Sequence, residues 1–239
     1  MVVYPFSERR DPQPGQTAYL HLSDLLMALR QYSTSEKIKL LDYGCGTSPY
    51  RGLFPNAEYR RADLPGVEET DYVINTEGGI NERDECFDCI LSTQVLAHVR
   101  DKQRYLRQCH RLLKRDGCLL LTTHGLYWDA PSPNDYWRWT ADGLREELCE
   151  AGFRVQRMHK ATTGGRAAMF VLDRHIHRVY GSRRRLVGSL LWLLKRAVGT
   201  RRRGLHLWCD EHLAHCRVVE ESDSESGFYI ALVAQARKA

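Results

Sequence analysis

The stretch Leu40-Leu41-Asp42-Tyr43-Gly44-Cys45-Gly46-Thr47-Ser48 decides the fold of this chain. An apolar run that starts at Ile38 ends at an acid and becomes a turn with two glycines. This pattern predicts a buried parallel strand that leads through a tight loop into a helix. Glycine suits such a loop because the backbone must bend sharply and let a ligand approach it closely.

An acidic residue follows the glycine loop at the distance expected for a ribose contact. A second strand is predicted over Ala57 to Asp63. A carboxylate at the end of that strand, about 20 residues beyond the loop, can accept hydrogen bonds from both hydroxyls of a ribose. The glycine spacing differs from the dinucleotide fingerprint, and no Gly-Lys-Ser/Thr follows, which excludes a Walker-type phosphate loop.

The composition is that of a globular protein, with 239 residues, 43% hydrophobic residues and a net charge of +5. The first residues lack the basic-then-apolar order of a signal peptide, and no apolar run approaches the roughly 20 residues that span a bilayer. Eight cysteines without a secretion signal indicate reduced thiols. We therefore expect a cytoplasmic protein.

The predicted elements alternate between strands and helices, which is typical of a βαβ sheet. Helices are expected over 17–32, over 102–114 with a stop at Asp116-Gly117, and from a cap at Thr140 through Ala151. Strands are expected over 38–43, 57–63, 72–75, 86–92, 118–123, 153–159 and 228–235. The prediction is one α/β domain over 1–239 with a Rossmann-like, seven-stranded, mostly parallel sheet, flanking helices and an antiparallel last strand. The predicted domain also includes an N-terminal helical segment over 1–35 and a basic helical insertion over 163–226, before the last strand.

Three segments resemble class I S-adenosylmethionine-dependent methyltransferases, in particular the group called methyltransferase type 11. LLDYGCGTS, at 40–48, resembles their first motif, with Ser48 in place of its third glycine. CFDCILSTQVLAHVRD, at 86–101, resembles FDxVxxxxVLEHVxD, with Ala97 where Glu is usual. LRQCHRLLKRDGCLLLTT, at 106–123, resembles LxExxRVLKPGGxLxLTT.

The resemblance implies S-adenosylmethionine as cofactor and a set of residues around it. Gly44 and Gly46 would approach its methionine portion, Asp63 would hold the ribose and Leu64 would pack on the adenine. Asn75 and Thr76 stand where an Asp often contacts the adenine end. The full set of predicted cofactor-binding residues is Asp42, Gly44, Cys45, Gly46, Asp63, Leu64, Asn75, Thr76, Ser92, Thr93 and Gln94.

PSPNDYWRWT, at 131–140, resembles a PxPxDYxRxT segment of methyltransferases in bacterial polysaccharide, lipid-linked sugar and secondary-metabolite pathways. Ala130 stands where those proteins often carry a histidine. Aromatic rings gather here, and sugars and planar metabolites both stack on such rings, although core packing explains at least two of them. The predicted acceptor-binding residues are Tyr127, Trp128, Tyr136, Trp137 and Arg138.

Methyl transfer to a hydroxyl needs a base within hydrogen-bond reach of the acceptor. The candidates for this catalytic role are His124, Asp135 and His98, with Asp129 nearby. His124 follows a strand whose carboxyl end faces the ligand crevice of an open α/β sheet, but a loop histidine bonded to backbone would look the same. A structural ion pair between Asp135 and Arg138 is favoured over a catalytic role.

The predicted function is O-methylation of a sugar, a lipid-linked glycan or a small metabolite. One alternative is an aromatic or quinone-like lipid acceptor, which the ring cluster allows. A second is a binding module that keeps this fold without catalysis, for which Ala97 and Asn75 are the signs. The intact pair of glycines and Asp63 disfavour that alternative.

Arg174 to Arg203 contains ten Lys or Arg residues, no Asp or Glu, and an apolar leucine stripe. Two interpretations stand: a helical cap over the site, or peripheral contact of segment 174–203 with the anionic inner membrane surface. Nucleic acid is disfavoured as a partner because aromatic residues are not interleaved with the arginines.

Histidines and cysteines near the C-terminal end invite a zinc hypothesis. They are His206, Cys209, His212, His215 and Cys216. Cys209, His212 and Cys216 would share a helical face, but the spacing matches no common structural zinc pattern and methyl transfer requires no metal. We predict no metal site, and we interpret Cys86 and Cys89 as core residues.

Overall fold

The computed structural model describes residues 6–76, 78–130, 134–179, 201–223 and 227–239. Its centre is an eight-stranded sheet in the order β3-β2-β1-β4-β5-β8-β6-β7. In chain order the elements are α1 (Phe6–Arg10), α2 (Tyr19–Arg30), β1 (Lys39–Tyr43), η1 (Arg51–Leu53), β2 (Glu58–Asp63), β3 (Tyr72–Val73), β4 (Phe87–Thr93), η2 (Leu96–His98), α3 (Lys102–Leu112), β5 (Leu113–His124), α4 (Ala141–Glu150), β6 (Phe153–Thr163), α5 (Gly164–Val179), α7 (Arg202–His212), η3 (Ala214–Cys216), β7 (Val218–Glu220) and β8 (Tyr229–Lys238).

The sheet is mixed. Strands β1 to β5 pair in parallel, whereas β8 lies antiparallel between β5 and β6. The predicted α/β fold and antiparallel last strand are therefore confirmed. The predicted count of seven strands is wrong, because a short strand, β7, pairs antiparallel with β6 at the sheet edge. That strand lies in 163–226, where only helices were expected.

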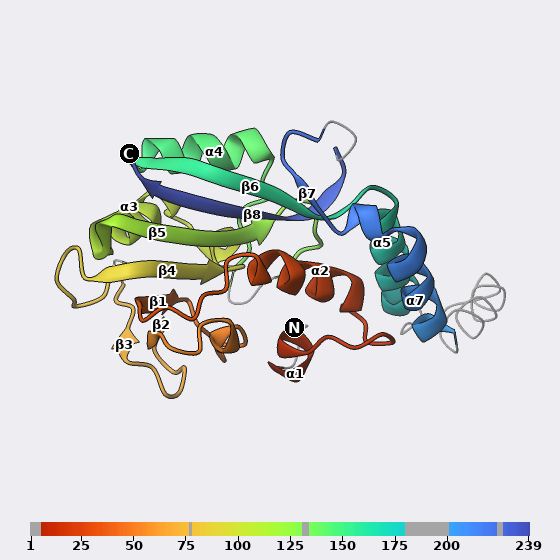
Figure 1. Ribbon diagram of the computed structural model, residues 1–239, viewed down its shortest axis with the longest axis horizontal. Coiled ribbons are helices and arrows are strands. Elements are labelled where there is room, and N and C mark those ends of the chain that lie inside the picture. The colour runs from red at the N-terminus through yellow and green to blue at the C-terminus, as the bar shows by residue number, and fades with distance from the viewer. Residues whose placement is uncertain (1–5, 77, 131–133, 180–200, 224–226) are drawn as a thin grey trace.

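Helices cover both faces of the sheet (Figure 1). On one face α2 buries Leu25 and Leu29 against strand residues such as Leu91. On the other face α3 and α4 bury Leu106 and Leu148 in a second, larger core. Burial of each such leucine contributes about 1.5–3 kcal/mol, so the two cores hold the carboxyl ends of the strands in fixed positions.

Local sequence determines where two of these helices begin. The Asp101 side chain accepts a hydrogen bond from the Arg104 amide at 2.9 Å and caps α3. Thr140, the predicted cap, accepts one from the Gly143 amide at 3.1 Å and caps α4. Each cap satisfies an amide that lacks a partner within its helix.

The boundary between α3 and β5 differs from the prediction. The helix was expected to reach Lys114 and to stop at Asp116-Gly117, but it ends at Leu112 and β5 starts at once. Leu113 pairs with Phe87 of β4, so tertiary pairing overrides the local Asp-Gly turn signal. The strand that was expected over 118–123 is therefore longer than predicted.

A buried ion network fastens α2 to the C-terminal part of the chain. The side chains of Asp24 and Arg166 are fully buried, and Arg166 Nε lies 2.7 Å from Asp24 Oδ2. Arg217 Nε lies 2.8 Å from Asp24 Oδ1, and the Thr162 hydroxyl donates to Asp24 Oδ2 at 3.0 Å. Arg166 also pairs with Asp210 of α7 at 2.9 Å. The network therefore sets the position of α2 relative to α5 and α7.

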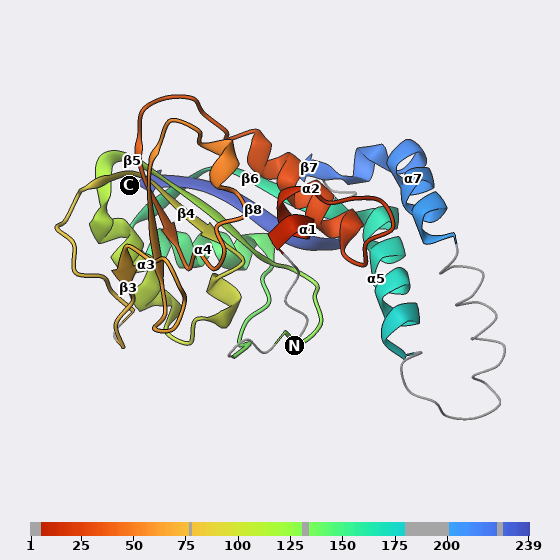
Figure 2. The same ribbon diagram turned by 90° about the horizontal axis from the view of Figure 1, so that it is seen from below.

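Helices α5 and α7 lie side by side at the end of the sheet toward which β4 and β5 run (Figures 1 and 2). Of the basic segment 174–203, residues 180–200 lie outside the described residues. Arg174 lies over the Trp128 ring at 5.2 Å, and Arg202 is buried beside Asp173 at 2.9 Å. Within the described ranges, no helix is long and apolar enough to cross a membrane.

All eight cysteines are free thiols. Helix α7 ends at His212, so Cys216, which lies in η3, does not share a helical face with Cys209 as the zinc hypothesis required. In the part of the chain that the structure describes, no group of three or more His, Cys, Asp or Glu side chains is placed to hold a metal ion.

Candidate active site

The glycine loop after β1 has the backbone shape that its sequence predicts. Gly44 has φ +85°, and a Cβ there would lie 2.5 Å from a methyl carbon of Val95, so only glycine allows this close approach. Gly46 has φ +50°, and a Cβ there would meet nothing within 4 Å, so its backbone is open to a ligand. Ser48 also has φ +50°, which explains why a glycine is usual at this position.

Arg61 of β2 compensates for the serine in the loop. Its Nε donates to the Ser48 hydroxyl at 2.9 Å, and an Nη group donates to the Gly46 carbonyl at 3.0 Å. The loop is therefore fastened by a side chain that sequence motifs did not single out. Its only signal in the sequence was its position two residues before Asp63.

Asp63 occupies the end of β2 next to this loop. Its Oδ2 accepts a hydrogen bond from the Gly46 amide at 2.6 Å, and its Oδ1 accepts one from the Leu64 amide at 2.7 Å. Each carboxylate oxygen has a second lone pair, so the group is held in place and can still accept hydroxyl donors. Its position and chemistry suit a ribose.

Asp42 and Cys45, two further predicted cofactor residues, are buried beside the loop. Tyr59 donates to Asp42 Oδ2 at 2.7 Å, and burial raises the pKa of this carboxyl to about 6. Its Oδ1 has no partner within the described residues. Burial also raises the pKa of the Cys45 thiol to about 12, so this cysteine contributes packing and backbone rather than a thiolate.

The residues that were predicted to meet the adenine lie beyond β2. Leu64 is 46% exposed, so its side chain is available to a planar ring. The Asn75 side-chain oxygen accepts from the Gly79 amide at 2.9 Å and shapes the loop, and Thr76 is exposed beside it. Asn75 thus has a loop-forming role that the sequence did not reveal.

The three residues predicted after β4 have different environments. The Ser92 hydroxyl is fully buried and accepts from Tyr105 of α3 at 2.8 Å, so its side chain faces α3, and its cofactor contact stays a prediction. Thr93 is partly buried at the strand end. Gln94 has φ +59° and donates to the Thr122 hydroxyl at 3.2 Å, while its buried Oε1 meets no described partner.

His124, at the last position of β5, is 6% exposed. Its ring stacks on Tyr127 with centroids 4.1 Å apart, and its Nδ1 is buried without a partner in the described ranges. Burial lowers the pKa of His124 well below the ordinary value, and the positive charges nearby act in the same direction. The imidazole is therefore neutral at physiological pH and able to accept a proton.

His98 and Asp135, the other candidate bases, are already engaged. His98 Nδ1 lies 2.6 Å from the Asn134 carbonyl, although its ring still meets His124 edge-on at 6.4 Å. Asp135 binds Arg138 through both oxygens, at 2.7 and 2.6 Å, and accepts from the Ala130 amide. This pairing lowers the pKa of Asp135 to about 2, so it is a poor base and the structural interpretation applies. Asp129 is exposed nearby.

The Arg138 guanidinium closes the loop that follows β5. It donates to the carbonyls of Tyr127 at 3.2 Å, Trp128 at 2.6 Å and Trp137 at 2.8 Å. A group with this many internal bonds positions the loop. Arg138 therefore has a structural role in this loop, and its acceptor contact stays a prediction.

The predicted aromatic residues separate into two groups. Trp137 donates to the Val99 carbonyl at 2.9 Å beneath Lys102, and Tyr136 is exposed beside it. Tyr127 instead stacks on His124, and both Tyr127 and Trp128 pack against Phe170 of α5. Only this second group adjoins the candidate base.

A histidine that no motif indicated completes this group. His21 of α2 is 2% exposed, and its ring lies 6.4 Å from His124, 5.8 Å from Tyr127 and 5.6 Å from Phe170. Burial lowers the pKa of His21 to about 3. In the sequence it is one polar position on an apolar helix, which gives no hint of what it faces.

The site fits S-adenosylmethionine. The open backbone at Gly46 and the held carboxylate of Asp63 match the methionine and ribose portions. The buried oxygens of Asp42 and Gln94, which lack partners within the described residues, are acceptors that an ammonium group would satisfy. Asp42 lies near the carboxyl end of β1 and Gln94 directly follows β4, and the carboxyl ends of such strands meet at the crevice where open α/β sheets bind ligands.

Comparisons with known proteins agree with this geometry. Residues 16–157 match the family model described as a methyltransferase domain. The mitochondrial ubiquinone biosynthesis O-methyltransferase of Rattus norvegicus is 30% identical over 36% of this chain, and the match spans only 30% of that protein. The cyclase SpnF has a crystal structure with TM-score 0.56 and 19% identity, covering 94% of this chain and 83% of that chain.

A structure with bound S-adenosylhomocysteine is also similar. It is the 1,6-didemethyltoxoflavin-N1-methyltransferase of Burkholderia thailandensis, with TM-score 0.50 and 15% identity, covering 90% of this chain and 77% of that chain. At such identities the structural likeness establishes the fold alone.

Proposed function

Because the chain belongs to the methyltransferase domain family, we propose that it transfers a methyl group from S-adenosylmethionine to a hydroxyl oxygen of a small acceptor. The observation that carries the proposal is His124, a buried neutral base at the carboxyl end of β5. Methyl transfer is an in-line displacement, so holding the two reactants in line supplies several kcal/mol of the rate enhancement.

The Gly44–Gly46 loop would hold the methionine portion and Asp63 would hold the ribose. When bound, the cofactor supplies a methyl carbon on a positively charged sulfur, which keeps the electron pair of the carbon–sulfur bond. Asp42 and Gln94 offer buried oxygens to the ammonium group. A bound cation would also favour the ionised form of Asp42.

His124 accepts the proton of the acceptor hydroxyl in this proposal. Its Nδ1 is buried without a described partner, so binding of a hydroxyl there adds a hydrogen bond and breaks none. Stacking on Tyr127 fixes the ring plane. General-base assistance of this kind contributes about 10²- to 10⁴-fold.

A weak base favours an acidic acceptor. Moving the hydroxyl proton to an imidazole of pKa below about 6.5 costs free energy in proportion to the difference in pKa. The cost is at least about 5 kcal/mol for a phenol and about 12 kcal/mol for a hydroxyl with the pKa of water. The rings of Tyr127, Trp128 and Phe170 add an apolar, aromatic surround. An aromatic hydroxyl is therefore the acceptor that we favour, and a sugar or lipid-linked glycan is the second candidate, since sugars also stack on aromatic rings.

Incubation of the protein with S-adenosylmethionine and two probes, catechol and methyl glucoside, tests this proposal. Formation of S-adenosylhomocysteine with catechol alone supports the aromatic acceptor, and formation with methyl glucoside alone supports the sugar. Tight cofactor binding without turnover of any probe would support the non-catalytic alternative. Binding to anionic vesicles through the exposed Arg201 and Arg203 is a separate proposal.

The pH dependence follows from the lowered pKa of His124. The base works when it is neutral, so activity is present above its pKa and is lost only as pH falls through the lowered value. We expect kcat/KM to be flat between about pH 6 and pH 8. If the base were a histidine of ordinary pKa, kcat/KM would fall several-fold at the acid end of that range. The charged or titratable groups that face His124 are His21, His98, Arg138 and Asp135.

A further inference from the structure

The acceptor site contains a second buried imidazole with the same unmet capacity for hydrogen bonding as the first. Nδ1 of His21 and Nδ1 of His124 are both buried, and neither has a partner among the described residues. The two side chains come from α2 and β5, which are 103 positions apart in the chain, yet their ring centroids lie 6.4 Å apart. A buried polar atom without a partner is uncommon and calls for an explanation.

This separation suits one shared oxygen atom. Two imidazole nitrogens that each lie about 2.8 Å from the same oxygen place their ring centroids about 6–8 Å apart, depending on the angle at the oxygen. At the observed 6.4 Å that angle is about 110°, the angle between donor and acceptor directions of a hydroxyl. A hydroxyl can accept from one imidazole N–H and donate to the nitrogen of the other.

We propose that His21 binds the acceptor hydroxyl together with His124, so that one oxygen is hydrogen-bonded by both imidazoles. This inference rests on the proposed function and specifies how its acceptor is held. His21 donates its N–H to one lone pair of the acceptor oxygen. This hydrogen bond orients the oxygen so that its other lone pair points toward the methyl carbon. As the oxygen–carbon bond forms and the carbon–sulfur bond breaks, the electron pair of the broken bond stays on sulfur. The hydroxyl proton passes to His124 and then to solvent.

The surroundings of His21 suit this role and keep its ring neutral near neutral pH, because burial and two arginines lower its pKa. The ring is 2% exposed and contacts Tyr127 and Phe170, and the charged groups that face it are Arg9 and Arg174. A neutral imidazole keeps both a donor and an acceptor, whereas an imidazolium has only donors. The ion network of Asp24, one turn further along α2, fixes the helix that carries His21.

Two variants separate hydrogen bonding from packing. His21→Phe keeps a ring against Phe170 but cannot donate, and His21→Asn keeps a donor on a shorter side chain. For the probe that the parent methylates, we expect kcat/KM to fall at least about tenfold in His21→Phe and less in His21→Asn. The KM for S-adenosylmethionine and the affinity for S-adenosylhomocysteine should change by less than about twofold.

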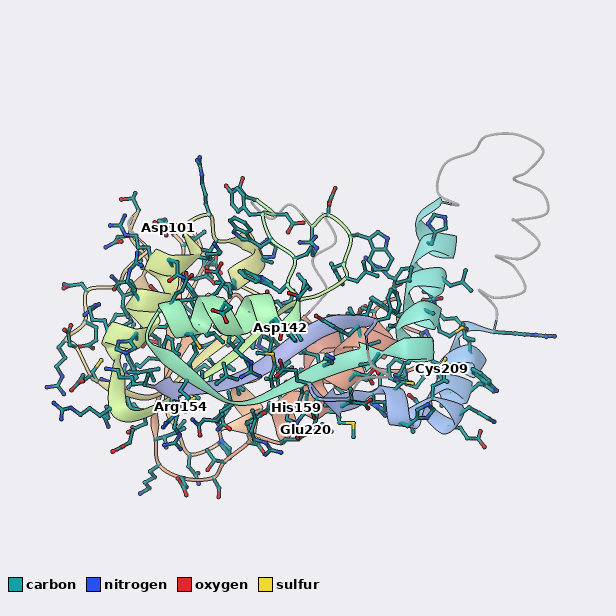
Figure 3. The ribbon with its side chains drawn as sticks, turned by 90° about the horizontal axis from the view of Figure 1, so that it is seen from above. Asp101, Asp142, Arg154, His159, Cys209 and Glu220 are labelled. Carbon is teal, nitrogen blue, oxygen red and sulfur yellow. The ribbon has the colours of Figure 1, made fainter. Side chains whose placement is uncertain are left out.

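His159→Asn is the matched control. His159 is also buried, at 3% exposure, but it bonds Tyr32 at 3.0 Å and Glu220 at 3.1 Å where β6 pairs with β7. Figure 3 shows His159 and Glu220 next to each other. The His159→Asn variant should leave kcat/KM for the probe unchanged, although it also removes a buried histidine. A general response to loss of a buried imidazole would affect all three variants equally.

A second measurement needs no turnover. With ¹⁵N-labelled histidine and bound S-adenosylhomocysteine, addition of catechol or methyl glucoside should shift the ring signals of His21 and His124 together. The proposal is overturned if the parent methylates a probe and His21→Phe does so equally well, or if the signal of His124 moves alone. If no probe is methylated but both signals move, the shared hydroxyl site stands and the proposed transfer fails. If no probe is methylated and neither signal moves, both fail.

Discussion

His124→Asn is expected to lower kcat about 10²- to 10⁴-fold, because it removes the proposed acceptor of the hydroxyl proton. The affinity for S-adenosylhomocysteine should stay within about threefold of the parent value, since the cofactor residues Gly46 and Asp63 are untouched. Steady-state kinetics on the methylated probe, together with calorimetric titration of S-adenosylhomocysteine, measure the two quantities separately.

His98→Asn is the comparison for this variant. His98 meets the His124 ring edge-on at 6.4 Å, but its Nδ1 is already bonded to the Asn134 carbonyl. We expect a loss of at most about tenfold. A collapse of activity in His98→Asn together with near-parent activity in His124→Asn would reverse the assignment of the base.

Asp24→Asn is expected to destabilise the fold by about 3–5 kcal/mol. The change removes the fully buried carboxylate that lies within 2.8 Å of both the Arg166 and the Arg217 guanidinium groups. Removing one partner of a buried ion pair costs this much because the remaining charge is desolvated, and here the two guanidinium groups would share only the carboxylate of Asp210. Urea unfolding at neutral pH measures the change in the free energy of unfolding.

An exposed ion pair provides the control for Asp24. Glu58 pairs with Arg60 at 2.9 Å, and both side chains are about half exposed. Glu58→Gln should therefore change the free energy of unfolding by less than about 1 kcal/mol. If Asp24→Asn proved as mild as this control, the network would not be what fastens α2 to α5 and α7.

Local sequence predicted the parts of the fold that depend on local chemistry. The strand before Gly44, the cap at Thr140 and the acid at Asp63 each follow from residue types at fixed spacing. The start of β5 was missed because Leu113 joins the sheet by pairing with Phe87, a contact that no local signal carries. β7 was missed because three residues are too few to show a periodic pattern.

The candidate site was predictable on the side of the cofactor and much less so on the side of the acceptor. Gly46 and Asp63 lie in contiguous motifs, so their proximity follows from parallel strand order. The ion pair of Asp135 with Arg138 joins residues three positions apart and agrees with the structural role that the sequence favoured. His21, in contrast, reaches His124 only because α2 packs over the sheet at the carboxyl end of β5. Such long-range contacts depend on the packing of whole elements.

Calorimetric titration of S-adenosylhomocysteine into the parent protein and into Asp63→Ala tests the central claim most directly. The account predicts micromolar binding by the parent and a loss on the order of 100-fold in the variant, because two hydrogen bonds to a charged group are removed. Circular dichroism of both proteins would confirm that they are folded. No binding by well-folded parent protein, or equal binding by both proteins, would contradict the account.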